Sequence, residues 1–400
     1  MNHRIVVRWV FAAIYFFCFL SGSAQDDRVQ YPVLLRNAYF GLNLGYINYP
    51  FSNAQLMPGY SAQSVTVPHM AVRLTLFGYR FNENLSAQIT YMRPVKWVEY
   101  QNINGDKSQH SVWMNVGGLT MKGKLPMSNK ISLYGETGLG LITRNGFDIN
   151  NEAVVSDASY ASLLAGGGLQ YHPNRKWTLN LSATWSPERR NKNQPYTLFL
   201  SGGFAYNMHP LSAERVQRNA SSGAVFPRNL LQIGYTTNAL GYGVNHFVAE
   251  GAVPIFWGGL AELRRGFAVN YQRNFFHTRS VFSLDLGASA GYWESRNLGN
   301  RFFTFSIYPL LRFTVLRTRP LDLYLFYSVA GPSFISRIDI DEKNTGKNFT
   351  FRDFMGMGVY AGRKRHLNAE LNIGHFSNGN IFAANAGVKI PLSFTLGYAF

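Results

Sequence analysis

The feature that most constrains this chain is an alternation of apolar with polar or small residues, repeated in sixteen stretches. The last stretch shows it best, since one face of an extended strand would carry Ile390, Leu392, Phe394, Leu396, Tyr398 and Phe400, and the other face Lys389, Ser393, Thr395, Gly397 and Ala399. An apolar outer face, a polar or small inner face and a C-terminal aromatic residue are typical of a membrane-spanning barrel wall. A soluble sandwich also alternates, but it needs neither this many strands nor a secretory leader. The alternation therefore predicts an all-β, transmembrane antiparallel β-barrel protein.

The stretches divide into two groups of eight. We predict strands near 36–49, 67–81, 84–95, 110–126, 130–146, 158–171, 176–186 and 196–208, and again near 228–240, 262–276, 280–294, 301–317, 320–336, 348–362, 366–378 and 387–400. Most reach the roughly 9–11 residues that a tilted spanning strand needs. Long and short connections alternate along each half, and barrels of the outer membrane have short periplasmic turns and longer external loops. Each half is therefore expected to begin and end in the periplasm.

The chain begins with a segment that resembles a secretory signal. Residues 1–25 combine a positive start at Arg4 and Arg8 with a short apolar run from Trp9 to Leu20 and an exit of small residues. The only cysteine, Cys18, lies in that run, so the mature chain would have neither disulfides nor thiolate metal sites. We expect a signal peptide and a destination in the cell outer membrane.

Between the two halves, residues 209–227 lose the alternation and contain serines, a glycine and two prolines, which indicates a periplasmic linker. The predicted organisation is an N-terminal eight-stranded barrel over 26–208, the linker, and a C-terminal eight-stranded barrel over 228–400. One sixteen-stranded barrel is the alternative, because the number of strands alone does not separate the two. An eight-stranded interior is filled by side chains, whereas sixteen strands would enclose an aqueous channel.

The composition points to an anionic partner. The formal net charge is +17, although charged residues make up only 15% of the chain. Basic proteins bind nucleic acids or phosphorylated membrane surfaces, and the leader favours the membrane over nucleic acid. The histidines lack the spacing of metal ligands, so we expect neither a metal nor another cofactor.

One pair of residues has the right chemistry for catalysis. His375 and Ser377 lie two positions apart in the fifteenth predicted strand, so they share a face. Leu371 and Ile373 lie on that face as well, which marks it as facing lipid, where polar side chains are costly. An imidazole can accept the proton of a serine hydroxyl and so make it a nucleophile. The spacing alone is common, and a histidine near an external loop is also an ordinary interfacial residue.

The second half of the chain, roughly 228–400, resembles the lipid A 3-O-deacylase (PagL-type) family of outer-membrane acyloxyacyl hydrolases. The resemblance depends on His375-Phe376-Ser377-Asn378, on Asn385 and Gly387, and on Phe349-Thr350-Phe351-Arg352-Asp353 followed by Gly356 and Gly358. The first half resembles OmpA-like barrels only in its general pattern, and fold analogy is not evidence of function.

The resemblance implies an eight-stranded barrel that removes the ester-linked 3-position acyl chain of lipid A. It implies that Ser377 is the nucleophile and His375 the general base. Asn378 and Asn385 would then be candidates for stabilising the oxyanion, a role that a side-chain amide can fill. The implied partners are lipid A or lipopolysaccharide of the outer leaflet and the surrounding membrane lipids, and Arg264, Arg265, Arg296 and Arg301, near predicted external strand ends, are candidates for its phosphates.

The chain departs from the family pattern at the acid. The family places a glutamate on the last strand, about fourteen residues after the histidine, where this chain has Lys389 or Ile390. Glu370 is the last acidic residue, and strand parity puts it on the face opposite His375. Three alternatives stay open: a Ser–His dyad, an acid from another strand, or a catalytically silent structural or lipopolysaccharide-binding barrel. The sequence also leaves open whether the protein forms a homodimer.

Overall fold

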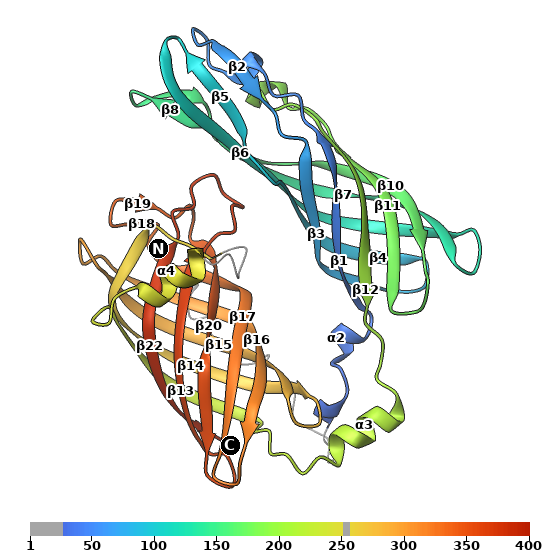
Figure 1. Ribbon diagram of the computed structural model, residues 1–400, viewed down its shortest axis with the longest axis vertical. Helices are drawn as coiled ribbons and strands as arrows, with labels where there is room; N and C mark the ends of the chain where they lie inside the picture. The colour runs from blue at the N-terminus through green and yellow to red at the C-terminus, as the bar shows by residue number, and fades with distance from the viewer. Residues whose placement is uncertain (1–26, 251–256) are drawn as a thin grey trace, which may run out of the picture.

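The computed structural model describes residues 27–250 and 257–400, so the expected signal peptide lies outside the described residues. Two closed antiparallel barrels follow each other along the chain (Figure 1). The prediction of two eight-stranded barrels is confirmed, and the single sixteen-stranded alternative is wrong, because each half closes by pairing its own first and last strands.

The first barrel closes where β1 pairs with β12. Its eight wall strands are β1 (Ala38–Asn48), β3 (Met70–Arg80), β4 (Leu85–Pro94), β6 (Asp106–Pro126), β7 (Ile131–Asn145), β10 (Ala158–Tyr171), β11 (Trp177–Ser186) and β12 (Thr197–Asn207). Beyond the wall, the long β6 extends the sheet through β5 (Val98–Ile103) and β2 (Ala62–Thr66), and β8 (Phe147–Ile149) forms a hairpin with β9 (Glu152–Val155). Short 3-10 turns occur at η2 (Asn53–Gln55) and η3 (Arg190–Lys192).

The second barrel closes where β13 pairs with β22. Its wall strands are β13 (Asn229–Thr237), β14 (Ala261–His277), β15 (Phe282–Ser295), β16 (Arg301–Arg317), β17 (Leu321–Ile335), β20 (Phe349–Ala361), β21 (Leu367–Ser377) and β22 (Val388–Ala399). A small hairpin of β18 (Asp339–Ile340) and β19 (Lys343–Asn344) stands in one long loop. β13 is shorter than its neighbours, so β14 and β22 pair directly beyond its end, at Ala261–Val388 and Glu262–Lys389.

The remaining elements are short. η1 (Asp27–Val29) and α2 (Val33–Arg36) precede the first barrel, α3 (Ala213–Ala220) lies in the predicted linker, and α4 (Gly243–Glu250) follows β13 beside the β14–β22 edge (Figure 1). Within the described residues, none of the helices has the length and apolar character needed to cross a membrane.

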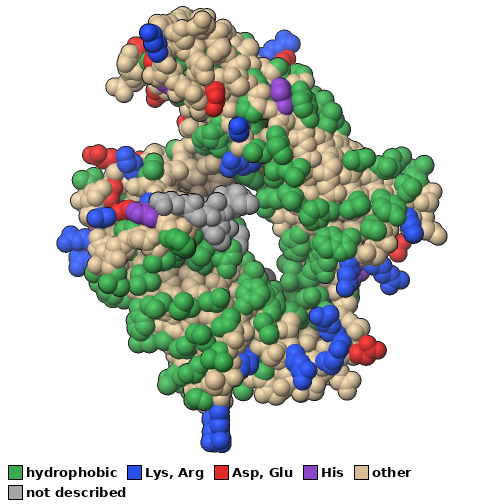
Figure 2. All heavy atoms as spheres, in the orientation of Figure 1, with side chains coloured by type: hydrophobic (Ala, Val, Ile, Leu, Met, Phe, Trp, Pro, Cys, Tyr) green, Lys and Arg blue, Asp and Glu red, His purple; other side chains and the backbone are tan. Residues whose placement is uncertain are grey.

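Both barrels carry apolar side chains outside and polar side chains inside. Large exposed apolar residues such as Leu139 and Leu181 of the first barrel and Ile233 and Leu396 of the second point outward, and Figure 2 shows such side chains covering both walls. Each interior contains a buried ion pair, Arg73 with Glu136 at 2.6 Å in the first barrel and Arg312 with Asp285 in the second. Lipid outside and a filled polar interior explain the alternation of the sequence.

One register shift corrects the face assignment of the last strand. Between Asn372 and Gly374 of β21, the partners on β22 jump from Ser393 to Ile390, so β22 contains an extra residue near Pro391. Such a bulge reverses the inward and outward alternation, and proline is tolerated there because it has no amide hydrogen to donate. Ile390 was expected outside, but it is buried among the core residues, and Lys389 takes the outer face opposite His375.

Candidate functional site

Four ionisable side chains lie side by side across the outer face of the second barrel. The strand pairing places Asp353 of β20 opposite His375 of β21, His375 opposite Lys389 of β22, and Lys389 opposite Glu262 of β14. The row crosses the wall near the ends of the strands that lead into the long loops. Ionisable groups on a wall otherwise covered by apolar side chains are costly, which makes this row a candidate functional site.

His375 is fully buried although it points outward, because the segment Trp257–Gly258 covers it. The Trp257 ring stacks on the imidazole with the ring centres 4.8 Å apart. The Gly258 amide donates to His375 Nδ1 at 3.0 Å, so this nitrogen is the unprotonated one. His375 Nε2 therefore carries the proton and donates to Asp353 Oδ2 at 2.9 Å. One nitrogen is oriented by a carboxylate and the other keeps a basic lone pair, which is the arrangement of a general base.

Asp353 supplies the carboxylate that the last strand lacks, and of the three alternatives the acid from another strand is the one that this geometry matches. Its other oxygen, Oδ1, accepts a hydrogen bond from the Ala330 amide, which holds the carboxylate in place. In the sequence, Asp353 belonged only to the segment that carries the family resemblance, and no role was predicted for it. The register of the hairpin was the available signal. Ala361 pairs with Leu367 beside the turn, so Asp353, eight residues before Ala361, pairs with His375, eight residues after Leu367.

Lys389 does not act against the imidazole in this arrangement. Its Nζ lies 3.9 Å from Glu262 Oε1, on the side away from Asp353. Glu262 also forms an ion pair of 2.5 Å with Arg296. The positive charge expected beside His375 is therefore balanced by an acidic residue on the next strand.

Ser377 is half-buried and belongs to a separate hydrogen-bond cluster. Its Oγ accepts hydrogen bonds from Asn385 Nδ2 at 3.1 Å and from the Gly379 amide at 3.3 Å. No hydrogen bond joins Ser377 to His375 in the part of the chain that the structure describes. The two residues share the outer face, but the nitrogen that would accept the serine proton is bound to Gly258.

The two asparagines occupy different positions. Asn385 lies directly beside Ser377, and its Oδ1 also accepts from the Asn378 amide at 2.9 Å. The Asn378 side chain is buried, and its Nδ2 donates to the carbonyls of Thr345 and Ala384 at 2.9 and 2.7 Å. In this conformation the side-chain amide of Asn385 donates to the Ser377 hydroxyl, whereas the side chain of Asn378 stabilises the loop.

A cavity of about 200 Å³ opens beside Ser377, and the first barrel forms one of its walls. Tyr91 and Arg93 of β4 line it together with Trp257, Ser377 and Asn385. Arg93 stacks on Trp97 at 4.4 Å. In the described residues no acidic group lies within ion-pair distance of Arg93. The cavity thus combines a hydroxyl, side-chain amides and a cation that is available to an anion.

The loop between β21 and β22 rests on the first barrel. Asn115 donates to the Asn380 carbonyl at 2.8 Å and Thr143 donates to the Ile381 carbonyl at 2.7 Å. Ser159 also donates to the Ile381 carbonyl, at 3.3 Å. These side chains share the outward parity of exposed leucines on β6, β7 and β10, so the contact lies on the outer wall. The first barrel therefore supports the loop that contains Asn385.

The external arginines proposed for phosphate binding are engaged with acidic residues. Arg264, Arg265 and Arg301 gather around Glu294, with N–O distances of 3.7, 2.9 and 3.9 Å. Among the described residues, no group of three or more histidine, cysteine or acidic side chains could hold a metal ion.

In comparison with known proteins, the two halves of the chain match two different family models. Residues 264–399 match the family model of lipid A 3-O-deacylase (PagL), and residues 12–207 match that of the outer membrane protein beta-barrel domain. The fold and these matches define the class: an outer-membrane protein made of two eight-stranded barrels. The second of these barrels is the part that resembles the deacylase family.

Several solved structures resemble the fold. Neisserial surface protein A is 15% identical to this chain, with a TM-score of 0.30. The matched region covers 43% of this chain and 97% of the Neisserial protein. The outer membrane enzyme PagL is 14% identical, also with a TM-score of 0.30, and covers 43% of this chain and 98% of its own. Ail of Yersinia pestis is 17% identical to this chain, with a TM-score of 0.28. The matched region covers 42% of this chain and 99% of Ail. A comparison with curated proteins finds no match.

Proposed function

We propose that the protein is an outer-membrane esterase that removes the 3-O-linked acyl chain from lipid A. The observation that carries the proposal is the hydrogen bond between Asp353 and His375 on the lipid-facing wall, two residues from Ser377. The match of residues 264–399 to the lipid A 3-O-deacylase model supports the choice of substrate.

In the proposed reaction the Ser377 Oγ attacks the ester carbonyl, and its proton passes to His375 Nδ1. Asp353 stabilises the imidazolium that forms, as the carboxylate of a triad does. In this proposal Asn385, whose side-chain amide donates to Ser377 Oγ, stabilises the oxyanion, and Asn378 is a second candidate. The bond to the sugar oxygen then breaks, and this oxygen takes the proton from the imidazolium. In the second half of the reaction water attacks the acyl-serine carbonyl and gives a proton to His375. The bond between the acyl carbon and Ser377 Oγ then breaks, this oxygen takes the proton from the imidazolium, and the fatty acid leaves.

Gly258 must release His375 for this reaction to begin. Its amide occupies Nδ1, which is the position that the Ser377 hydroxyl needs. Trp257 and Gly258 also border the cavity beside Ser377, so a substrate that enters the cavity contacts the same segment. We therefore assign the conformation described here to a resting state in which the base is capped.

Arg93 completes the proposed substrate site. It lines the same cavity as Ser377, and lipid A carries phosphate groups for which a guanidinium is the preferred ligand. In this proposal the first barrel contributes the anion contact and the second barrel the acyl-transfer chemistry.

The test is mass spectrometry of lipid A from cells that contain the wild-type protein, Ser377→Ala or no protein. Loss of one hydroxyacyl chain in the wild type alone is the expected result. The rival is a catalytically silent structural or lipopolysaccharide-binding barrel, which the absence of a Ser377–His375 hydrogen bond favours. Unchanged lipid A in cells with folded wild-type protein would support that rival and contradict the esterase.

A further inference from the structure

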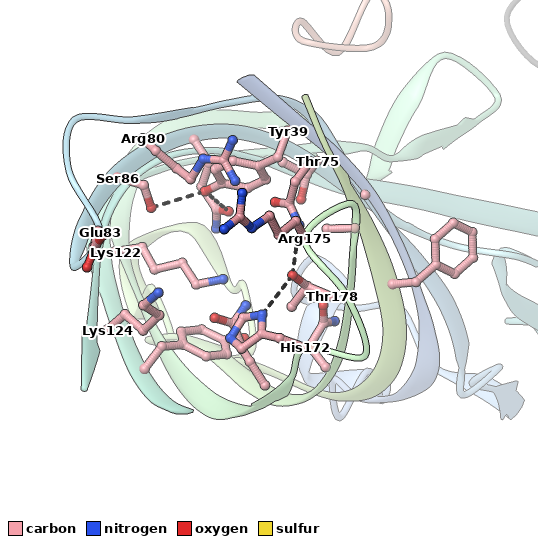
Figure 3. Close-up of a pocket in the computed structure, with 18 of the residues that line it drawn as sticks. Tyr39, Thr75, Arg80, Glu83, Ser86, Lys122, Lys124, His172, Arg175 and Thr178 are labelled. Carbon is pink, nitrogen blue, oxygen red and sulfur yellow. Dashed lines mark hydrogen bonds between the residues drawn. The ribbon is translucent and has the colours of Figure 1, made fainter. Parts of the chain in front are cut away.

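A second cavity, of about 440 Å³, lies inside the first barrel (Figure 3). Its lining includes Asn82–Leu85, Asn129–Lys130 and Pro173–Arg175, which belong to the short turns between wall strands. These turns lie at the end of the barrel where its first and last strands begin and end, which is the periplasmic end in the expected topology. The cavity therefore opens away from the site at Ser377, and it has no part in the proposed deacylation.

Cations converge on this cavity from three elements. Figure 3 shows Arg80 of β3, Lys122 and Lys124 of β6, and Arg175 of the turn after β10 around the same space. The only acidic residue of its lining is Glu83. In residues 27–250 and 257–400, none of the four cations is within ion-pair distance of a carboxylate. Lys122 instead packs over the Tyr134 ring at 3.8 Å, and Arg80 donates to the Met208 carbonyl at 2.6 Å.

The inner end of the cavity is closed and electrically balanced. Arg73 is buried and pairs with Glu136 through both carboxylate oxygens, and Gln88 and Thr120 donate to the same carboxylate. This layer compensates its own charge and leaves the positive charge of the cavity wall uncompensated. A closed inner end describes a binding pocket and not a channel.

His172 reports the positive field of the cavity. Its ring is held between Ser132 at 2.9 Å and Thr178 at 3.1 Å. Burial lowers the pKa of this histidine below its ordinary value, and the charges of Lys124 and Lys122 lower it further. A further positive charge is therefore disfavoured in this cavity.

We propose that this cavity binds a soluble phosphorylated small molecule from the periplasm. Several cations around one space favour a group with more than one negative charge, and phosphate meets lysine and arginine with charge-assisted hydrogen bonds. The volume exceeds that of a lone phosphate, and Asn43, Ser86 and Gln170 in the lining are suited to hydroxyl groups. The class is therefore a sugar phosphate or a nucleotide, held by its phosphate.

The experiment measures binding of pyrophosphate and of AMP to the full-length protein in detergent micelles by calorimetry. Wild-type protein is expected to bind both, with affinity that falls as salt rises. Lys122→Gln and, separately, Arg175→Gln should each weaken binding by about tenfold or more, since each removes a hydrogen bond to a charged group. Lys96→Gln, at an exposed position remote from the cavity, is the matched control and should bind like wild type.

Two further readouts decide the remaining outcomes. In the wild type, bound pyrophosphate should raise the pKa of His172. This pKa is measured from the ring proton signals of His172. Absence of binding, equal binding by all variants, or no response of His172 would overturn the proposal. Displacement of pyrophosphate by short-chain phosphatidylglycerol, with no binding of AMP, would assign the site to a lipid headgroup and overturn the soluble ligand. Arg175 lies in a turn, so Arg175→Gln still tests the proposal if Lys122→Gln does not fold.

Discussion

Both barrels have eight wall strands, close by pairing their own first and last strands and contain a buried ion pair, but they differ in where their other ionisable side chains gather. In the first barrel these groups line an internal cavity that opens at the turns. In the second barrel they stand on the outer wall, as the row Asp353, His375, Lys389 and Glu262. A filled eight-stranded interior leaves little room for a lipid substrate, so chemistry on a lipid has to take place outside the wall. The difference indicates that the position of the polar groups relative to the wall, and not the fold, separates the functions proposed for the two halves.

The largest effect is expected at the acid. Asp353→Asn should lower the rate of fatty acid release by about 10³- to 10⁴-fold, because the imidazolium loses its carboxylate and the ring its orientation. Asp339→Asn, in the exposed hairpin of the neighbouring loop, is the matched control and should act like wild type. A rate for Asp353→Asn within twofold of wild type would remove Asp353 from the mechanism.

Breaking an internal ion pair should affect one barrel and spare the other. Glu136→Gln leaves Arg73 buried without its charge partner, which should cost the first barrel about 3–5 kcal/mol of unfolding free energy. Circular dichroism during thermal unfolding measures the effect, and exposed Glu188→Gln is the control. Esterase activity below the unfolding temperature should stay near wild type. A loss of activity equal to that of Ser377→Ala would show that the barrels are not separable in this way.

Asn385 and Asn378 should respond differently to truncation. Asn385→Ala is expected to lower kcat by about 10²- to 10³-fold, the range seen when one oxyanion donor is removed. Asn378→Ala should mainly release the loop that it braces, which limited proteolysis of the folded protein would detect. Equal loss of kcat in both variants, without increased cleavage, would assign both amides to the oxyanion.

Arg93 tests whether the first barrel completes the site of the second. Arg93→Gln should raise KM for lipid A by about tenfold with little change in kcat, since a phosphate contact is made in both the ground and transition states. Arg189→Gln is the matched control, because Arg189 also stacks on an aromatic ring, Tyr160, but does not line the cavity. With lipid A that lacks phosphates, the two variants should give the same KM. An unchanged KM for Arg93→Gln on phosphorylated lipid A would remove the first barrel from substrate binding.

The smallest effect is expected at the cap on the histidine. Gly258→Pro replaces the amide hydrogen that occupies His375 Nδ1 with a ring Cδ, which is too large for the 3.0 Å between the two nitrogens, so the variant excludes the capped position. A Cβ at this position meets no atom within 4 Å, so an alanine is accommodated there. Loss of one such hydrogen bond, about 0.5–1.5 kcal/mol, should raise kcat by roughly two- to tenfold. Gly258→Ala keeps the amide and should match the wild type. A lower kcat for the proline variant alone would mean that the segment positions His375 and does not restrain it.

Strand alternation was sufficient to predict the class and the sixteen wall strands, because lipid outside and a packed interior impose a period of two on every strand. The loss of alternation at 209–227 favoured two barrels, but only the closure of each half excluded one barrel of sixteen strands. Strand alternation was also sufficient to place His375 and Ser377 on the same outer face. It failed at Ile390 and Lys389, where a bulge near Pro391 reverses the faces; a proline inside a strand was the available signal, because proline is confined to edges and bulges of a sheet.

The sequence by itself determined which residues face lipid over the regular parts of the strands, and the short motif around His375 and Ser377 indicated where chemistry could occur. Only the tertiary structure decided what surrounds them: Asp353 as the partner of His375, Glu262 as the partner of Lys389, Gly258 over the ring, and Arg93 from the other barrel. The physical reason is the distance along the chain over which each feature is set. Side-chain alternation is a local consequence of the extended backbone, whereas contacts between distant strands and between barrels depend on register, closure and loop packing, which the whole chain sets together.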